Sequence, residues 1–366
     1  MTKSILLEPI EFGPYRLSNR IVMSPMTRNR SPNELPNALN AEYYAQRATA
    51  GLIISESTAI SAEGLGWPET PGIFTDAQEA GWKRVTDGVH QRGGRMFLQL
   101  WHCGRNSHPL TQPHGQAPIG PSAVQPTGTV RTREGRLPLH VPRELPANEV
   151  GRLIDDYRAA ARRAMAAGFD GVEVHAANGY LLDQFLKDSS NLRADRYGGA
   201  PLNRCRLMIE VVTAVAEIWG AERVGVRLSP VSPSNYQLVD SDPELLMVTA
   251  LTELSRLGIC YVAMVEGSSN AMPATHELDY GRLRKHFTGL YIANNAFTQA
   301  RAEQALQERR ADLISFGRLY IANPDLVRRF TLNAPLNPLN ADSIYTSDHR
   351  GYTDYPALAD EPATAA

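Results

Sequence analysis

The sequence has few of the residues that disulfides, metal centres and amine catalysis require. Its three cysteines lie far apart and form no CxxC pair, which argues against a disulfide framework or structural zinc and is typical of a reduced cytoplasmic protein. Only four lysines occur in 366 residues, and none ends a predicted strand, so Schiff-base catalysis has no candidate. No HxH motif closes the first strand, and we expect no metal site.

Long apolar runs are also missing. No run approaches the length that spans a bilayer, and the start of the chain, MTKSILLEPIEF, lacks the apolar core and cleavage site of a signal peptide. The net charge of −2 gives no basic excess for nucleic acid or acidic membranes. No GxGxxG follows the first predicted strand, which argues against a Rossmann domain. We therefore expect a cytoplasmic protein without nucleic-acid or membrane partners.

What the sequence does have is a regular alternation of short apolar runs and amphipathic stretches. Eight runs rich in Val, Ile, Leu and aromatics predict buried strands at residues 20–26, 51–58, 95–102, 171–176, 224–230, 261–267, 290–295 and 313–317. Helical periodicity predicts helices at 78–92, 148–167, 203–219, 243–257, 298–309 and 323–330. This order predicts one domain over residues 1–366, a (β/α)8 barrel. Residues 107–145, rich in Pro and Gly, form an expected insertion that covers the barrel mouth, and 357–366 an expected flexible tail.

Polar side chains gather at the predicted carboxyl ends of these strands, where barrels carry their chemistry. A lone His175-x-x-Asn178 would more often be a capped strand end with a core histidine, but the whole ring of such residues favours a ligand site. Donors with few ionisable acids suit an organic cofactor. The ring comprises Thr27, Arg28, Glu56, Ser57, Thr58, Gln99, Trp101, His102, His175, Asn178, Arg227, Asn294, Asn295, Gly317 and Arg318.

A flavin fits these residue types. Thr27 and Gln99 can pair with the carbonyl and N–H groups of its ring edge, and Arg227 can neutralise the negative charge of the reduced ring. Barrels commonly bind phosphate with the loops after strands seven and eight, which here carry Asn294-Asn295 and Gly317-Arg318.

Motifs over nearly the whole chain carry a family resemblance. They are NRIVMSPMTRNR (19–30), AGLIISEST (50–58), QLWHCGRNSH (99–108), HAANGYLLDQFL (175–186), NLRADRYGG (191–199), RLSPV (227–231), VEG (265–267), FGRLYIANPDLV (316–327) and GYTDYPAL (351–358). The chain resembles the Old Yellow Enzyme family of FMN-dependent ene-reductases, and within it the bacterial N-ethylmaleimide reductase and glycerol trinitrate reductase branch. Trp67 stands where relatives usually have Tyr, and Ser57 where Ala or Gly is common.

The resemblance implies a role for each site residue. Noncovalent FMN would contact Pro25, Met26, Thr27, Ser57, Gln99, His175 and Arg227, with its phosphate near Asn294, Asn295, Gly317 and Arg318. His175 and Asn178 would bind the substrate's electron-withdrawing oxygen, and Tyr180 would donate the proton. Trp67, Trp101 and Tyr345 would line the substrate pocket.

The implied activity is a ping-pong reduction of activated alkenes with NADPH or NADH as hydride donor. Reductive denitration of nitrate esters or nitroaromatics is an alternative that needs the same donors, and a flavin-binding barrel without turnover is another. Expected partners are activated alkenes and phenolic ligands, and the expected assembly is a monomer or weak homodimer.

Overall fold

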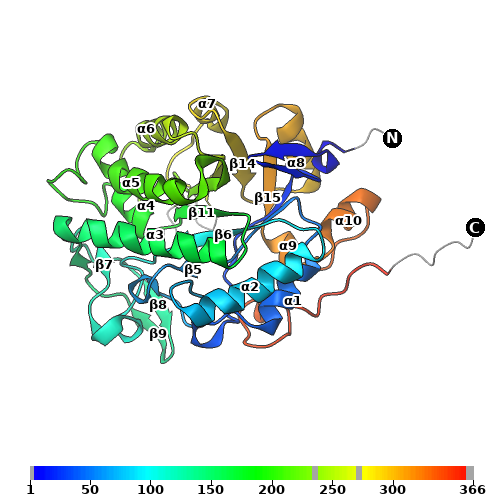
Figure 1. Cartoon of the computed structure of the whole chain (residues 1–366). Helices are drawn as coiled ribbons and strands as arrows, with labels where there is room; N and C mark the ends of the chain where they lie inside the picture. The colour runs from blue at the N-terminus through cyan, green and yellow to red at the C-terminus, as the bar shows by residue number, and fades with distance from the viewer. Residues whose placement is uncertain (1–3, 233–237, 269–273, 360–366) are drawn as a thin grey trace, which may run out of the picture.

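Eight parallel strands close into a barrel in the computed structural model, which describes residues 4–232, 238–268 and 274–359 (Figure 1). Every strand pairs in parallel with the next around the ring, and the pairing of the last strand with the first closes it. The barrel strands are β3 (Ile21–Met23), β4 (Leu52–Ile54), β6 (Met96–Trp101), β11 (Gly171–Ala176), β12 (Val224–Leu228), β13 (Tyr261–Val265), β14 (Leu290–Asn294) and β15 (Leu313–Phe316). The predicted (β/α)8 fold is confirmed.

Helices cover the outside of the barrel (Figure 1). Five lie close to their predicted positions: α2 (Asp76–His90), α3 (Val150–Ala166), α5 (Pro201–Trp219), α6 (Pro243–Arg256) and α8 (Gln299–Gln307). Three more, α1 (Ala38–Gln46), α4 (Leu181–Leu186) and α7 (Tyr280–Arg284), were not predicted. Two of these are too short to show a helical period.

The predicted helix over residues 323–330 is wrong in its bounds. The chain forms α9 (Arg318–Ala322) and then α10 (Leu326–Leu332), with a break at Asn323. Asn323 precedes Pro324, and the proline ring disfavours helical backbone at the residue before it. The break leaves a separate short helix beginning directly after β15.

The strand predicted over residues 51–58 is also interrupted. β4 ends at Ile54, and a second short strand, β5 (Thr58–Ala59), pairs further along β6. Between them the hydroxyls of Ser55 and Thr58 both donate to the carbonyl of Glu56, at 2.9 Å each. Such local hydrogen bonds compete with strand pairing.

The inside of the barrel is apolar at its amino-terminal end. Side chains that face inward from six strands pack together there, and Phe12 packs on Phe97 and Tyr261 at ring distances of 5.7 and 5.3 Å. Phe12 belongs to a hairpin of β1 (Ile10–Phe12) and β2 (Tyr15–Leu17), which closes this end of the barrel.

Polar side chains replace apolar ones toward the carboxyl end. Because inward-facing residues recur every second position, Gln99 follows Phe97 and Asn294 follows Ile292 on the inward face. The register places Glu173 beside Gln99, His175 beside Arg227, and Asn294 beside Ser315. The inside of the barrel is therefore polar toward its carboxyl end and apolar at its amino-terminal end.

The insertion over residues 107–145 contains its own short strands. β7 (Ile119–Gly120) pairs in parallel with β10 (Arg143–Glu144), and β8 (Thr129–Thr132) forms a hairpin with β9 (Gly135–Pro138) that lies at the lower left of Figure 1. At the other end of the chain, Leu358 is held by its N–H to the Asp325 carboxylate at 2.7 Å. Residues 360–366 of the predicted flexible tail lie outside the described residues. No helix in the described ranges has the length and apolarity needed to cross a membrane.

Candidate active site

A cavity of about 530 Å³ opens at the carboxyl ends of the barrel strands. Its walls come from residues of β6, β11, β12, β14 and β15, from the segments that follow β3, β4, β5, β11, β14 and β15, and from residues 344–345. Almost every predicted site residue borders it: Pro25, Met26, Thr27, Ser57, Trp67, Gln99, His175, Asn178, Tyr180, Arg227, Asn294, Asn295, Gly317, Arg318 and Tyr345. The structure therefore brings together residues spread over more than three hundred positions of the chain.

Gln99 is fixed by hydrogen bonds on both sides of its amide. Its nitrogen donates to the Glu173 carboxylate at 2.8 Å, and its oxygen accepts from the Ser57 hydroxyl at 2.8 Å. Tyr261 donates to the other oxygen of Glu173 at 3.0 Å. Burial raises the pKa of Glu173, while Arg227 opposes that shift. Sequence reasoning missed Glu173, although a carboxylate two residues before His175 in an apolar strand was the available signal.

Arg227 is a buried cation, and some of its N–H groups have no hydrogen-bond partner among the described residues. Its Nη2 donates to the Asn294 side-chain oxygen at 2.7 Å, but Nε and Nη1 have no partner within the described residues. Burial lowers the pKa of Arg227, although a guanidinium stays protonated in proteins. Asn294 is held in turn by bonds to Ser24 at 3.0 Å and to the Ser315 carbonyl at 2.9 Å. Asn294 thus fixes Arg227. Because the side-chain oxygen and nitrogen of Asn294 already have partners in the protein, this amide has little hydrogen-bonding capacity for a phosphate.

The loops after β14 and β15 form the far wall. Asn295 takes a positive φ of 113° and donates to the carbonyls of Glu266 and Ser268 at 2.6 and 2.7 Å. Arg318 begins α9 on the cavity wall and makes no ion pair or side-chain hydrogen bond in the described part of the chain. A guanidinium placed this way can grip an anion.

His175, Asn178 and Tyr180 form the opposite wall. Nδ1 of His175 and the side-chain oxygen of Asn178 lack partners within the described ranges, and the rings of His175 and Tyr180 meet edge to face at 5.2 Å. Burial, helped by Arg227, lowers the pKa of His175 well below its ordinary value. The site therefore offers a neutral imidazole, an amide and a phenol to one ligand.

Trp101 is not among the residues that line the cavity, and its contact with substrate stays a prediction. Its side chain is 1% exposed and packs edge to face under Tyr180 at 5.2 Å. Trp101 lies two residues beyond Gln99, on the same inward face of β6, and it packs in one cluster with Trp67 and Tyr180, which both line the cavity. Its indole thus contacts the ring of a cavity-lining residue.

Trp67 and Tyr345 stand at the cavity mouth, with ring centroids 6.3 Å apart. Two buried arginines secure the segment that carries Tyr345. Arg28 and Arg30 both donate to the Ile344 carbonyl, at 3.2 and 2.5 Å, and Arg30 also reaches the carbonyls of Ser343 and Arg350 at 2.9 Å each. Sequence reasoning missed Arg30, since nothing in TRNR (27–30) separates a buried arginine from a surface one.

A second, polar cavity of about 460 Å³ adjoins the mouth at Tyr345. The insertion contributes Arg131 and Arg133 to it, and the C-terminal segment contributes Arg350. The insertion thus reaches a cavity that Tyr345 also lines, and its covering of the barrel mouth stays a prediction.

An FMN group fits this cavity on the chemistry of its donors. Acceptors of a flavin ring would satisfy the two unpartnered nitrogens of Arg227, which are otherwise costly to bury. Gln99 and Thr27 supply further polar groups to the same space, and Arg318 lies at the end of the cavity suited to a phosphate. No cluster of three metal-ligating side chains occurs among the described residues.

Known proteins share this arrangement. The family model "NADH:flavin oxidoreductase / NADH oxidase family" matches residues 5–337. The chain is 45% identical to 12-oxophytodienoate reductase 1 of Oryza sativa subsp. japonica, over 96% of this chain and 93% of that protein. Arabidopsis thaliana 12-oxophytodienoate reductase 2 is 42% identical, over 96% of each chain.

Solved structures agree with the fold in detail. The Old Yellow Enzyme homologue from Zymomonas mobilis superposes with a TM-score of 0.93 at 47% identity, covering 96% of this chain and 99% of that one. Morphinone reductase in complex with tetrahydroNAD gives 0.92 at 46%, covering 97% and 98%. Placement in the N-ethylmaleimide reductase branch stays a prediction. On these matches and this site, the chain belongs to the NADH:flavin oxidoreductase / NADH oxidase family and is an FMN-dependent, NAD(P)H-oxidising enzyme of the Old Yellow Enzyme type.

Proposed function

We propose that this enzyme reduces the C=C bond of activated alkenes such as enones, maleimides and nitroalkenes. One observation carries the proposal: a single cavity holds His175, Asn178 and Tyr180 together with Arg227, whose Nε and Nη1 have no partner within the described residues. When bound, FMN supplies the hydride, which it has received from NADPH or NADH in a ping-pong cycle. The relatives named for the reduction of 12-oxophytodienoate and morphinone support this substrate class.

Each side chain has a distinct role in this proposal. Arg227 offsets negative charge on the reduced cofactor, while Gln99 and Thr27 hold its ring edge and Arg318 its phosphate. His175 and Asn178 hold the substrate's carbonyl or nitro oxygen, and they stabilise the charge that this oxygen gains as hydride reaches the β-carbon. Because the imidazole of His175 is neutral, it acts as a hydrogen-bond donor and not as an acid.

Tyr180 supplies the proton to the α-carbon. A tyrosine hydroxyl is among the side-chain groups that act as general acids. A barrel that only bound flavin would need no acid on this wall. The presence of Tyr180 therefore argues against the alternative of a flavin-binding barrel without turnover.

A direct test begins with the cofactor. Denaturing the purified yellow protein should release FMN, identified by chromatography, and NADPH should bleach the native protein under nitrogen. Adding cyclohexenone or N-ethylmaleimide should restore the colour and yield the saturated product. Release of FAD, or bleaching without reoxidation by any alkene, would overturn the proposal. Faster reoxidation by glycerol trinitrate, with nitrite release, would make denitration the main activity.

We further propose a single cytoplasmic domain that acts as a monomer or weak homodimer on small molecules. Light scattering of the FMN-loaded protein across a concentration series tests the assembly state.

A further inference from the structure

The turn that carries Asn178 has an unusual backbone. Asn178 and Gly179 both take positive φ, at 58° and 83°. L side chains rarely adopt this region, so a non-glycine residue there needs support from its surroundings. The turn leads directly into Tyr180, which lies at the amino-terminal end of α4. Whatever supports the turn also places the amide and the phenol of the site.

Asp183 holds both consecutive N–H groups of this turn. Its Oδ2 accepts directly from the N–H of Gly179 at 2.8 Å and from the hydroxyl of Ser229 at 3.4 Å. The Ser229 oxygen in turn accepts from the N–H of Asn178 at 2.7 Å. Asp183 itself lies in α4, one helical turn after Tyr180. Its carboxylate therefore points back toward the start of the helix, where it contacts the residue before Tyr180.

A buried lysine completes the support. The Lys187 ammonium lies 3.9 Å from Asp183 Oδ1 and donates to the Pro230 carbonyl at 2.6 Å, next to Ser229. The side chains of Lys187 and Asp183 are 1% and 2% exposed. Burial raises the pKa of Asp183, and Lys187 opposes that shift. The lysine thus offsets the charge of Asp183 and fixes the end of β12 that presents Ser229.

We infer that Asp183, acting with Ser229 and Lys187, is a positioning residue that holds the Asn178 amide and the Tyr180 hydroxyl against the cavity. The inference rests on the proposed function, since it assigns the turn a substrate oxygen and a proton transfer. Removing the support relaxes the turn, while His175 keeps its place because β11 itself carries it. Oxygen binding weakens, and protonation suffers more than hydride transfer.

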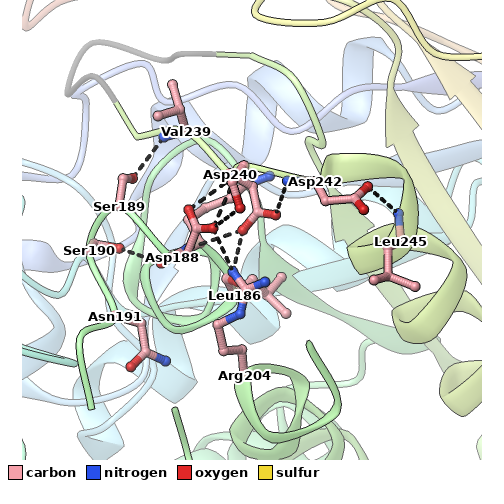
Figure 2. Close-up of polar contacts among 12 residues, drawn as sticks. Leu186, Asp188, Ser189, Ser190, Asn191, Arg204, Val239, Asp240, Asp242 and Leu245 are labelled. Atoms are coloured by element: carbon pink, nitrogen blue, oxygen red, sulfur yellow. Dashed lines mark hydrogen bonds and ion pairs between the residues drawn. The ribbon is translucent and has the colours of Figure 1, made fainter. Parts of the chain in front are cut away.

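The chain offers a matched control nearby. Asp240 is also buried, at 2% exposed, and pairs with Arg204 of α5 (Figure 2). Its carboxylate accepts from the N–H groups of Asp188 and Asp242 at 3.1 Å each. Asp240 therefore fastens the start of α6 to the turn after α4 and makes no hydrogen bond to residues 178–180. Asp240→Asn changes the charge of a buried carboxylate in the same region and removes no hydrogen bond to the site turn, so it measures by itself the effect of this charge on Asp183.

The experiment compares Asp183→Asn, Ser229→Ala and Asp240→Asn in the FMN-loaded enzyme. Titration with 4-hydroxybenzaldehyde, followed by the long-wavelength absorption of its flavin complex, gives an equilibrium Kd. We expect Ser229→Ala and Asp183→Asn to raise this Kd about tenfold, the usual effect of one lost hydrogen bond. They should also lower the cyclohexenone-to-nitrostyrene ratio of kcat/KM, because a nitronate can leave unprotonated. Ser229→Thr, which keeps the hydroxyl, should restore both values.

The readouts separate this inference from the proposed function. If the wild-type enzyme binds 4-hydroxybenzaldehyde but reduces no alkene, the proposed function is wrong. The positioning role of Asp183 can still be tested in that case, since the comparison of Kd values needs no turnover. If Asp183→Asn fails to fold, Ser229→Ala decides, because it removes a single hydroxyl. A Kd and a substrate ratio in Ser229→Ala equal to those of Asp240→Asn, whatever the melting temperatures, overturn the positioning role.

Discussion

His175 and Arg227 lie opposite each other in the register of β11 and β12, so a guanidinium stands beside the imidazole that faces the cavity. Burial is the larger cause of the lowered pKa of His175, and the positive charge of Arg227 adds to it. The pairing allows two functions on neighbouring strands. Arg227 provides the fixed positive charge, and His175 stays an uncharged donor that does not repel it.

His175 should therefore stay neutral at a pH where an ordinary histidine, with a pKa of about 6.5, is already half protonated. The sign for stability follows from the lowered pKa. The folded state keeps the ring neutral while the unfolded chain takes up a proton, so this stabilisation is complete above pH 6.5 and is lost as the pH falls. Imidazole ¹⁵N shifts, assigned with His175→Asn, measure the charge. A protonated His175 signal at pH 6 would contradict the expectation.

Replacing Arg227 tests the fixed charge. Arg227→Met should weaken FMN binding roughly 10- to 100-fold, which corresponds to about 1.5–3 kcal/mol for a hydrogen bond to a charged group. In protein reloaded with FMN, the flavin midpoint potential should fall, because negative charge on the reduced ring loses its partner. Fluorescence titration and anaerobic dye-linked reduction measure the two effects. An unchanged potential at full occupancy would remove Arg227 from this role.

Glu173 should act in the opposite direction. Its carboxylate lowers the net positive potential that Arg227 provides, so Glu173→Gln should raise the flavin midpoint potential. Glutamine keeps the shape and an oxygen for the Gln99 amide, which limits the structural change. The same dye-linked reduction measures the shift. A potential that stays at the wild-type value would show that Glu173 is already protonated in the native enzyme.

Local sequence was sufficient for most of the barrel and for the cavity wall. Strand and helix periods placed the elements, and the polar residue types at strand ends selected Gln99, His175 and Arg227. What failed depends on contacts between distant residues. The helical period predicts that Met165 lies on the apolar face of α3, yet its side chain is 41% exposed, because the helix packs through Leu153, Tyr157, Ala161 and other residues instead.

Contacts between residues of different strands and segments could not be predicted from the local sequence either. Glu173 becomes a site residue only because β6 places Gln99 beside it, and the contact of Trp101 with Tyr180 joins β6 to the turn after β11. Arg30 is buried only because residues 343–350 return over it from the other end of the chain. Each outcome is set by register and packing rather than by local sequence.

Trp67 should limit the size of substrates at the mouth, where it faces Tyr345. Trp67→Ala removes a large ring from the cavity wall, and it should raise kcat/KM for enones bulky at the β-carbon relative to cyclohexenone. Trp67→Tyr, the residue usual in relatives, is the matched control and should fall between the two. If all three proteins give the same ratio of kcat/KM values, Trp67 does not limit the pocket.

Tyr180 should act only as the proton donor, and Tyr180→Phe isolates that role because phenylalanine keeps the edge-to-face contact with Trp101. Flavin reduction by NADPH should stay close to wild type in stopped flow. Reoxidation by cyclohexenone should slow by about 10²–10⁴-fold, the usual cost of losing a general acid. Nitrostyrene should suffer less, since its nitronate can leave unprotonated. His175→Ala should instead weaken phenol binding and slow both alkenes, which separates oxygen binding from proton transfer. Wild-type reoxidation of Tyr180→Phe by cyclohexenone would mean that another group, or water, delivers the proton.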